Sequence, residues 1–336
     1  MQIDMFGMNR QPVTVAWGGG LDSTAMIVEM HERGEQIDLV TFANLHAERP
    51  WTYDTVAYYR QWMEDRGIQV AEVSYVPTNV KHYPMYRGLL ENCLTNGTLP
   101  SIAFGFSSCS QKHKIAPQNK FLENWEPAVT AWSQGLKVTR CIGYDTSPAD
   151  LKRYAEREGY VDDRFDYDYP LRRWGWTRDD CAQSLAKRGL PEVKKSACFF
   201  CTATKPIELH EYPKAMLRLI VLMEARAAPR LRNVEGLWRK AVKGNRGGTP
   251  KPGAMTDYIR EQALLPADEI DLIVNEAPRA LITWQEAQSI LPLSERPAMR
   301  EWVDFFDRNI ELFREKGVIE LYEGAPGGDP RLKEAA

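Results

Sequence analysis

The chain has 336 residues, of which 43% are hydrophobic and 26% are charged, and its formal net charge is −3. These values are typical of a soluble globular protein with one large or two medium domains, and the charge argues against a protein that binds nucleic acid over its whole surface. The sequence has no apolar run of about 18 residues, and residues 1–10 lack the charged and apolar regions of a signal peptide. We therefore expect a cytoplasmic protein without membrane contact. The six cysteines are too few and too unevenly placed for a disulfide scaffold.

Strand and helix patterns alternate through the first half of the chain. We predict strands at 13–17, 37–43, 70–76 and 137–144, and helices at 23–33, 52–66, 116–125, 148–158 and 178–188. This alternation predicts an α/β fold with a doubly wound, mainly parallel sheet, whose ligands bind outside the carboxyl ends of the strands.

Beyond Cys201 the pattern becomes mostly helical. We predict helices at 212–227 and 302–316, a flexible basic loop at 244–253 and a loosely ordered tail at 324–330. The expected domains are therefore an α/β domain over residues 1–205 and a helical, locally basic region over residues 206–336. Residues 210–254 hold ten lysines and arginines against three acidic residues. This basic segment, 214–251, is either a solvated helical face or a face that binds a polyanion.

A glycine-rich turn joins the first predicted strand to the first predicted helix. It comprises Gly18, Gly19 and Gly20, followed by Leu21, Asp22, Ser23 and Thr24. Glycines let the backbone approach an anion closely, and a helix start offers unpaired N–H groups and the positive end of the helix dipole. The turn therefore predicts a phosphate site, although such a turn can also be only a tight connection. It is neither a Walker A loop nor a Gly-x-Gly-x-x-Gly fingerprint.

The string Trp17-Gly-Gly-Gly-Leu-Asp-Ser23 resembles the PP-loop, Ser-Gly-Gly-x-Asp-Ser, of the N-type ATP pyrophosphatases and phosphoadenosine phosphosulfate (PAPS) reductases. It departs from that pattern at Gly18, where the usual residue is serine, so one hydroxyl contact to phosphate is missing. The resemblance implies an adenine nucleotide alpha-hydrolase-like fold, binding of ATP with Mg²⁺, and a catalytic role for Asp22.

Two cysteine segments form the second signal. Cys198 and Cys201 lie in a Cys-Phe-Phe-Cys string, which could hold a metal ion or cluster, form a redox dithiol or half a zinc site, or simply be buried. Cys109 precedes Lys112 and Lys114. Nearby cations lower the pKa of a thiol and can also bind an anionic ligand. A closed zinc site would need a further ligand, for which the nearby candidates are His113 and His210. The remaining cysteines, Cys93, Cys141 and Cys181, are predicted core residues.

These segments resemble those of the PAPS reductase family and its sulfurtransferase relatives, where Cys-x-x-x-x-Lys-Ile-x-Pro pairs with a distal Cys-x-x-Cys. Adenylylsulfate reductases have two adjacent cysteines in the first segment, whereas this chain has Ser108-Cys109. The resemblance therefore implies Cys109, Cys198 and Cys201 as ligands of a [4Fe-4S] cluster with one open iron, as in cluster-dependent thiolation enzymes. Lys114 is the basic residue that we expect to contact phosphate or sulfate in catalysis, with a solvated lysine as the alternative.

The resemblance extends over roughly residues 10 to 215. It includes Arg140-Cys-Ile-Gly-Tyr-Asp145 and a Pro-Leu segment at 169–177, but Thr202 stands where proline is common. It implies nucleotide contacts from Gly143 and Asp145. After the second strand, Asn44 and Glu48 are nucleotide-binding candidates, with ordinary loop polarity as the alternative.

Three functions fit these patterns. The first is an enzyme that adenylates a substrate with ATP and then transfers sulfur to it, on a nucleic acid held by the basic segment. The second is a sulfonucleotide reductase, which the missing second cysteine disfavours. The third is a non-catalytic nucleotide-binding module with structural Zn²⁺. The expected partners are an adenine nucleotide, a nucleic acid, a sulfur-donor protein and a second copy of the chain in a homodimer.

Overall fold

The computed structural model describes residues 10–77, 84–106, 108–244 and 250–308. The chain forms two compact units, each drawn from separate stretches of sequence. The first comprises Met1–Asn44, Glu48–Ser74 and Lys114–Ala197, and the second comprises Leu45–Ala47, Tyr75–His113 and Cys198–Ala336. The sequence instead predicts two continuous domains that meet after residue 205.

The first unit contains a five-stranded sheet in which every strand pair is parallel. Its strands are β1 (Val13–Trp17), β2 (Leu39–Ala43), β3 (Val70–Val73), β4 (Val138–Ile142) and β5 (Phe165–Asp168). They are arranged in the order β3-β2-β1-β4-β5, so the chain winds outward from β1 in one direction and then in the other. The predicted doubly wound α/β fold is confirmed.

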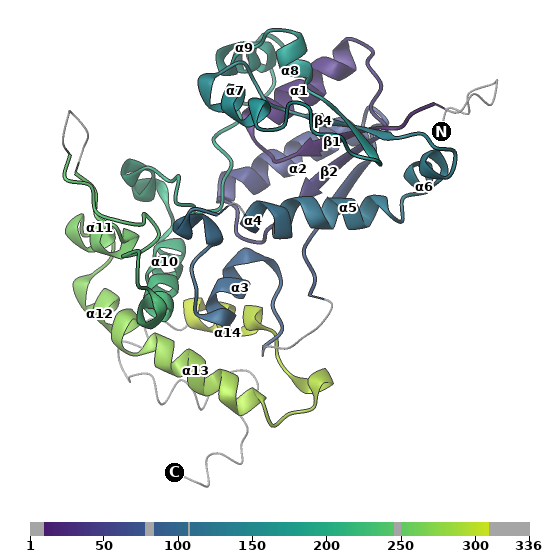
Figure 1. Cartoon of the computed structure of the whole chain (residues 1–336). Helices are drawn as coiled ribbons and strands as arrows, with labels where there is room; N and C mark the ends of the chain where they lie inside the picture. Colours follow the sequence, from purple (N-terminus) through teal and green to yellow (C-terminus); the bar gives the residue numbers. More distant parts are fainter. Residues whose placement is uncertain (1–9, 78–83, 107, 245–249, 309–336) are drawn as a thin grey trace. The chain divides into compact units, whose positions relative to one another are not determined.

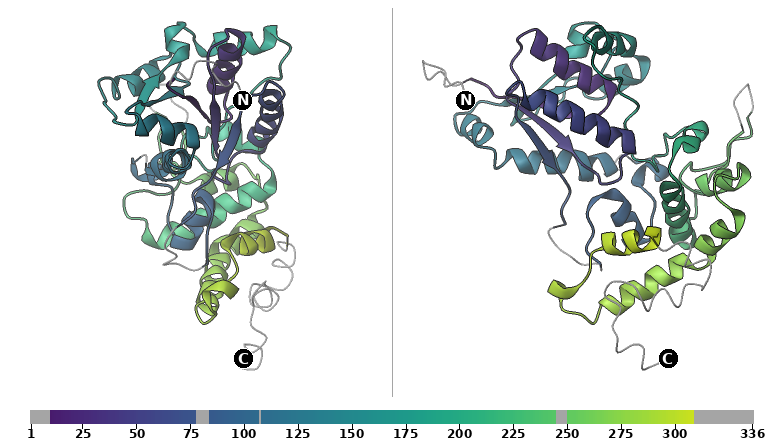
Figure 2. Two further views of the ribbon diagram at one scale, coloured as in Figure 1. Left: turned by 90° about the vertical axis from the view of Figure 1, so that its right-hand side faces the viewer. Right: turned by 180° about the vertical axis from the view of Figure 1, so that it is seen from behind.

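Helices cover both faces of this sheet (Figure 1). On one face α1 (Leu21–Glu32) and α2 (Pro50–Glu64) lie side by side (Figure 2) and share a buried core with α9 (Arg178–Lys187). On the other face α5 (Ala116–Leu122) and α6 (Glu126–Ser133) bury apolar side chains against β2 and β4. The shorter helices α7 (Pro148–Ala155) and α8 (Pro170–Arg173) flank β5 in the sequence. Parallel sheets need this cover because both of their faces are apolar.

The predicted elements of this unit are confirmed with small shifts at their ends. β1 has the predicted bounds, whereas α1 begins at Leu21, two residues before the predicted start, because Gly20 occupies the N-cap position. β5 was not predicted. Its sequence, Phe-Asp-Tyr-Asp, has acidic residues at alternate positions and only Phe165 buried, as an edge strand permits.

The second unit is helical, as expected for the C-terminal region. It contains α3 (Gly88–Asn96), α4 (Ser108–Ser110), α10 (Lys214–Ala227), α11 (Met255–Glu261), α12 (Ala267–Asn275), α13 (Ala277–Gln288) and α14 (Met299–Arg308). The predicted helix at 212–227 is α10, which buries apolar side chains and packs with α3, α11, α12 and α13. The predicted helix at 302–316 is described as far as Arg308, and the predicted tail at 324–330 lies outside the described residues.

The buried carboxylate of Glu224, near the end of α10, organises the loop that leads to α11. It accepts hydrogen bonds from the backbone N–H groups of Leu237 at 2.7 Å, Met255 at 2.9 Å and Thr256 at 2.7 Å. Burial raises the pKa of Glu224, and these donors oppose the rise. Across the described ranges of both units, the helices are too short or too polar to cross a membrane.

Candidate nucleotide-binding site

The glycine turn Gly18–Gly20 lies at the carboxyl end of β1, directly before α1. β1 is flanked by β2 and β4, and the chain changes its direction of winding between β1 and β4. In open α/β sheets this switch point is where ligands bind, because the loops on either side leave a crevice outside the strand ends. The structure therefore places the predicted phosphate turn at the edge of the sheet where a ligand is expected.

Two of the three glycines are required by geometry. Gly19 has a φ of +65°, and a side chain there would lie 3.0 Å from methyl groups of both Thr52 and Val56. A side chain at Gly20 would lie 2.6 Å from Ser196 Oγ. Gly18 differs, because nothing lies within 4 Å of the position its Cβ would take. The departure from the PP-loop pattern at Gly18 therefore leaves open space where the usual serine would stand.

The start of α1 combines free backbone donors with an internally bonded turn. The N–H of Thr24 bonds to the Gly20 carbonyl at 3.0 Å, so the N–H groups before it have no partner within the helix. Ser23 Oγ lies 3.4 Å from the Gly18 N–H and 3.3 Å from the Gly20 carbonyl, which closes the turn. The Thr24 hydroxyl is buried and accepts a 2.9 Å hydrogen bond from Trp17 Nε1, which fixes α1 to β1. Leu21 is a core residue.

The loop after β4 meets the first turn of α1. A side chain at Gly143 would lie 2.9 Å from the Cα of Ser23 and 3.0 Å from its nitrogen, so only glycine allows this approach. Asp145, which follows, is buried and accepts a 2.8 Å hydrogen bond from the Ser147 N–H. The structure thus brings Gly143 next to the first turn of α1, which follows the glycine turn.

Asp22 is the most perturbed polar residue of the turn. Its Oδ2 lies 2.7 Å from Arg178 Nη1, whereas its Oδ1 is buried without a hydrogen-bond partner. Burial raises the pKa of Asp22, Arg178 opposes this rise, and the charges of Asp145 and Asp150 add to it. A buried carboxylate oxygen without a partner is suited to a ligand or cation that arrives with substrate.

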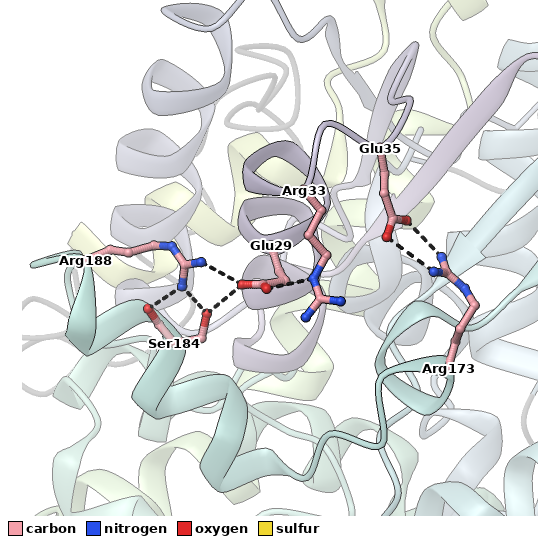
Figure 3. A network of polar contacts seen from close by, with 6 residues as sticks. All are labelled: Glu29, Arg33, Glu35, Arg173, Ser184 and Arg188. Carbon is pink, nitrogen blue, oxygen red and sulfur yellow. Dashed lines mark hydrogen bonds and ion pairs between the residues drawn. The ribbon is translucent and has the colours of Figure 1, made fainter.

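A polar network holds α9 against α1 (Figure 3). Glu29 of α1 accepts hydrogen bonds from Arg33 Nε at 2.8 Å and Arg188 Nη2 at 2.7 Å, and Ser184 Oγ lies 3.3 Å from it. A second pair joins Glu35 to Arg173 at 2.8 Å. The Thr177–Asp180 capping box then fixes the start of α9, where Arg178 is the first helical residue.

The candidates after β2 are engaged in polar contacts. Asn44 donates to Glu72 at 2.8 Å and accepts from the Tyr53 hydroxyl at 3.2 Å. Glu48 is 2% exposed, and its Oε2 lacks a hydrogen-bond partner. Burial raises the pKa of Glu48, while Lys114 and Arg49 oppose the rise. Lys114 Nζ lies 3.9 Å from Glu48 Oε1. Lys114 belongs to a five-residue π-helical turn, Gln111–Ile115, and such turns are often found at functional sites.

The three predicted metal ligands all belong to the second unit. Cys109 lies on α4, with its N–H bonded to Ser101 Oγ at 2.9 Å. Cys198 and Cys201 form a turn in which the Cys201 N–H bonds to the Cys198 carbonyl at 3.0 Å. Cys198 is buried, whereas Cys109 and Cys201 are partly exposed. The predicted burial of Cys93, Cys141 and Cys181 is confirmed.

These cysteines, as placed, do not form a site for a [4Fe-4S] cluster or Zn²⁺. In the part of the chain that the structure describes, no three cysteine, histidine, aspartate or glutamate side chains are close enough to hold a metal ion. His113 is buried and His210 contacts the Tyr258 hydroxyl at 3.2 Å. Mg²⁺ makes a lesser demand, because one or two carboxylates plus substrate phosphates suffice to hold it, and Asp22 fits that role.

Much of the basic segment 214–251 is used inside the second unit. Arg218 is ion-paired with Glu269 at 2.7 Å, Arg226 bonds to Gln285 at 3.2 Å, and Lys251 lies over the Trp238 ring at 5.0 Å. Residues 245–249 of this segment lie outside the described ranges. These contacts reduce the number of basic side chains that a polyanion could meet.

Sequence reasoning missed Arg178 and Ser196 as neighbours of the glycine turn. Arg178 was assigned only to the start of a helix, and no local pattern links it to Asp22, which lies 156 residues away. Ser196 precedes Cys198 by two residues, and no local pattern links it to Gly20.

Comparison with known proteins gives little further information. No protein-family model matches the sequence, and no curated protein matches it. Among solved structures, the U34-tRNA thiolase NcsA from Methanococcus maripaludis, solved with its [4Fe-4S] cluster, aligns at 14% sequence identity. The alignment covers 77% of this chain and 83% of that chain, with a TM-score of 0.34. At this TM-score the likeness establishes neither a shared fold nor a shared activity.

Proposed function

We propose that this protein binds ATP at the turn Gly18–Thr24 and splits it between the α- and β-phosphates. The observation that carries the proposal is the position of the turn. It lies at the switch point of a doubly wound parallel sheet, at a helix start, and in contact with Gly143 of the neighbouring strand's loop. The resemblance to the PP-loop supplies the reaction, because that loop binds the phosphates that leave as pyrophosphate.

In the proposed reaction an acceptor oxygen attacks the α-phosphorus, the bond to the β-phosphate oxygen breaks, and pyrophosphate leaves with the bonding electron pair. Backbone N–H groups of the turn and of the α1 start stabilise the negative charge that develops on the phosphates. Asp22 would hold Mg²⁺ against the phosphates, and the ion would neutralise their charge when bound. Lys114 is the proposed side-chain cation.

Sulfur transfer to the adenylated acceptor is the second part of the proposal. A sulfur nucleophile would displace AMP and leave a carbon–sulfur bond in place of the activated oxygen. Support comes from Cys109, Cys198 and Cys201 in the sequence pattern, and from Ser196, which touches the turn and precedes Cys198 by two residues. A nucleic acid is the proposed acceptor.

The adenylation step is tested by the products formed from ATP. The full chain is incubated with Mg²⁺, sulfide and ATP labelled at the α-phosphate, with total tRNA or DNA as acceptor. We expect labelled AMP together with unlabelled pyrophosphate, and the loss of both products in Asp22→Ala. The control Asp54→Ala, which alters an exposed carboxylate on α2, should form both products. Formation of ADP and orthophosphate, or no cleavage with either acceptor, would contradict the proposal.

The cluster is tested separately by metal analysis of protein purified without oxygen. We expect iron, acid-labile sulfide and a broad visible absorbance, all lost in Cys198→Ala. Cys181→Ala is the control, because Cys181 is a buried core residue of the other unit. Colourless protein that contains stoichiometric zinc, or no metal, would overturn the cluster assignment and leave the ATP chemistry to its own test.

A further inference from the structure

A hollow of about 250 Å³ lies beside the edge strand β5 in the first unit. Its walls come from β5 and from the end of α7 with the segment that follows it. None of the lining residues belongs to the loops that follow β1, β2 or β4, so the hollow is separate from the glycine turn. Its volume is below the range of about 300 to 1,000 Å³ that is usual for drug-sized ligands, and suits a single ring system.

The walls of the hollow carry four tyrosines. Tyr169 is stacked on Tyr144, which is not a wall residue, with ring centroids 5.6 Å apart and an angle of 23° between the ring planes. The ring centroids of Tyr160 and Tyr167 lie 6.2 Å apart. Tyr154 is the fourth. Tyr160 is 60% exposed, so much of its side chain is accessible to a ligand. Aromatic faces of this kind stack on nucleobases of any sequence.

The walls hold three acidic residues, of which Asp166 alone has an ion pair within the described ranges. Asp166 is paired with Lys137 at 3.2 Å and accepts from Gln11 at 2.8 Å. Asp162 accepts hydrogen bonds from the backbone N–H groups of Arg164 at 2.8 Å and Phe165 at 3.1 Å. Glu158, which is exposed, is the remaining acid of the walls.

Two arginines at the hollow have no such partner. Within residues 10–77, 84–106, 108–244 and 250–308, no carboxylate lies at ion-pair distance from Arg157, a wall residue, or from Arg140. Arg140 is 5% exposed, packs on the Phe165 ring at 4.0 Å and has an Nη2 without a hydrogen-bond partner. It is in register with Tyr167 on the adjacent strand. Arg157, which has no ion pair within the described ranges, lies beside the tyrosines, while the nearby charge of Asp162 acts on the buried Arg140.

We propose that this hollow binds a nucleotide, with its base on the exposed face of Tyr160 and its phosphate at Arg157. Stacking and a guanidinium–phosphate contact together select a planar base that carries an anion. The nucleotide can be a free mononucleotide or an unpaired residue of an RNA or DNA strand, since both offer the same chemistry. The inference goes beyond the proposed function, because binding here uses neither the glycine turn nor the cysteines.

The test is binding of a fluorescein-labelled ten-residue oligouridine and of UMP to the full chain, measured by anisotropy and by competition. Tyr160→Ala is expected to weaken binding at least fivefold, as loss of one stacked base does. Arg157→Gln should also weaken binding and lower the slope of log K against log salt by about 0.7 for a single strand. The matched controls are Tyr58→Ala, another exposed tyrosine at 45%, and Lys152→Gln, an exposed cation on α7.

The experiment distinguishes a nucleic-acid strand from a free nucleotide as the ligand, and it distinguishes this inference from the ATP proposal. Tight binding of the oligouridine with weak competition by UMP identifies a strand, whereas equal binding identifies a free nucleotide. A Gly19→Val variant should bind the oligouridine normally, so failure of the ATP proposal leaves this result unchanged. No binding of either ligand, or binding by Tyr160→Ala and Arg157→Gln as tight as by the two controls, would overturn the inference.

Discussion

Asp22 and Arg178 are 156 residues apart in the sequence, yet Asp22 Oδ2 lies 2.7 Å from Arg178 Nη1. The pair joins the first turn of α1 to the first turn of α9. It leaves Asp22 Oδ1 buried and without a partner, so Asp22 is anchored through one oxygen and available through the other. Arg178 thereby opposes the rise in the pKa of Asp22 that burial causes.

Replacing Arg178 tests that arrangement. Burial raises the pKa of Asp22 and Arg178 opposes this, so Arg178→Gln should raise the pKa further. If ionised Asp22 is needed, the acidic limb of the pH profile for pyrophosphate release should move to higher pH, with several-fold less activity near pH 6. Arg178→Lys should shift the acidic limb less, because lysine keeps a positive charge beside Asp22.

The control for that series is Arg173→Gln, which removes a similarly exposed arginine that pairs with Glu35 instead. Stability should change by at most about 1 kcal/mol in each variant, because both pairs are partly exposed. An unchanged acidic limb in Arg178→Gln would show that the pair does not control the ionisation of Asp22.

Gly18→Ser restores the residue usual in the PP-loop. Nothing lies within 4 Å of the added Cβ, and Gly18 is absent from the glycines with positive φ, so the fold should tolerate serine. One added hydrogen bond to phosphate should strengthen ATP binding about two- to tenfold, as measured by calorimetry. Weaker binding in a folded Gly18→Ser variant would mean that phosphate does not lie beside this position.

Glu29→Gln tests the network that fixes α9. Glu29 is a largely buried acceptor for Arg33 and Arg188, so the loss of its charge should lower the free energy of unfolding by about 1 to 3 kcal/mol in urea. Glu35→Gln, which breaks the more exposed pair with Arg173, should cost less than about 1 kcal/mol. An equal loss of unfolding free energy in the two variants would contradict the expectation that the more buried ion pairs contribute more stability.

His113 makes stability depend on pH. Burial lowers its pKa to about 4, and Lys112 adds to this effect, so the folded protein keeps a neutral ring at pH 5.5 where the unfolded chain takes up a proton. Its contribution is fully present above the ordinary value of 6.5 and is lost as the pH falls towards about 4. When the pH falls from 7.5 to 5.5, the free energy of unfolding should fall by about 1 kcal/mol more in wild type than in His113→Gln.

That prediction is checked by urea unfolding of both proteins at the two pH values. An identical loss of stability in wild type and variant would show that His113 titrates normally in the fold.

The glycine turn and the elements around it could be predicted because their causes are local. Strand β1 is a continuous apolar run, and Gly19 and Gly20 directly precede a helix start. The contact between Gly143 and Ser23 was expected only through the resemblance, since strand order is set by packing between distant segments. β5 was missed because its buried content is a single phenylalanine.

The cysteine site and the domain division show where sequence reasoning stopped. Helix α3 packs with the C-terminal helices α10 and α14 rather than with the strand that precedes it in the sequence, and no local pattern signals such a long-range contact. The spacing of Cys109, Cys198 and Cys201 predicts ligands, but spacing alone does not bring three thiols to one point. Whether they bind a cluster stays a prediction.

The central claim is that the turn Gly18–Thr24 binds the phosphates of ATP, and equilibrium binding of a non-hydrolysable α,β-methylene ATP analogue tests it most directly. Wild type should bind the analogue in the presence of Mg²⁺. Gly19→Val should lose at least tenfold in affinity, because a side chain there strikes Thr52 and Val56 and disfavours the left-handed backbone. Circular dichroism would confirm that the variant is folded. Absence of binding by wild type, or equal binding by folded Gly19→Val, would contradict the account.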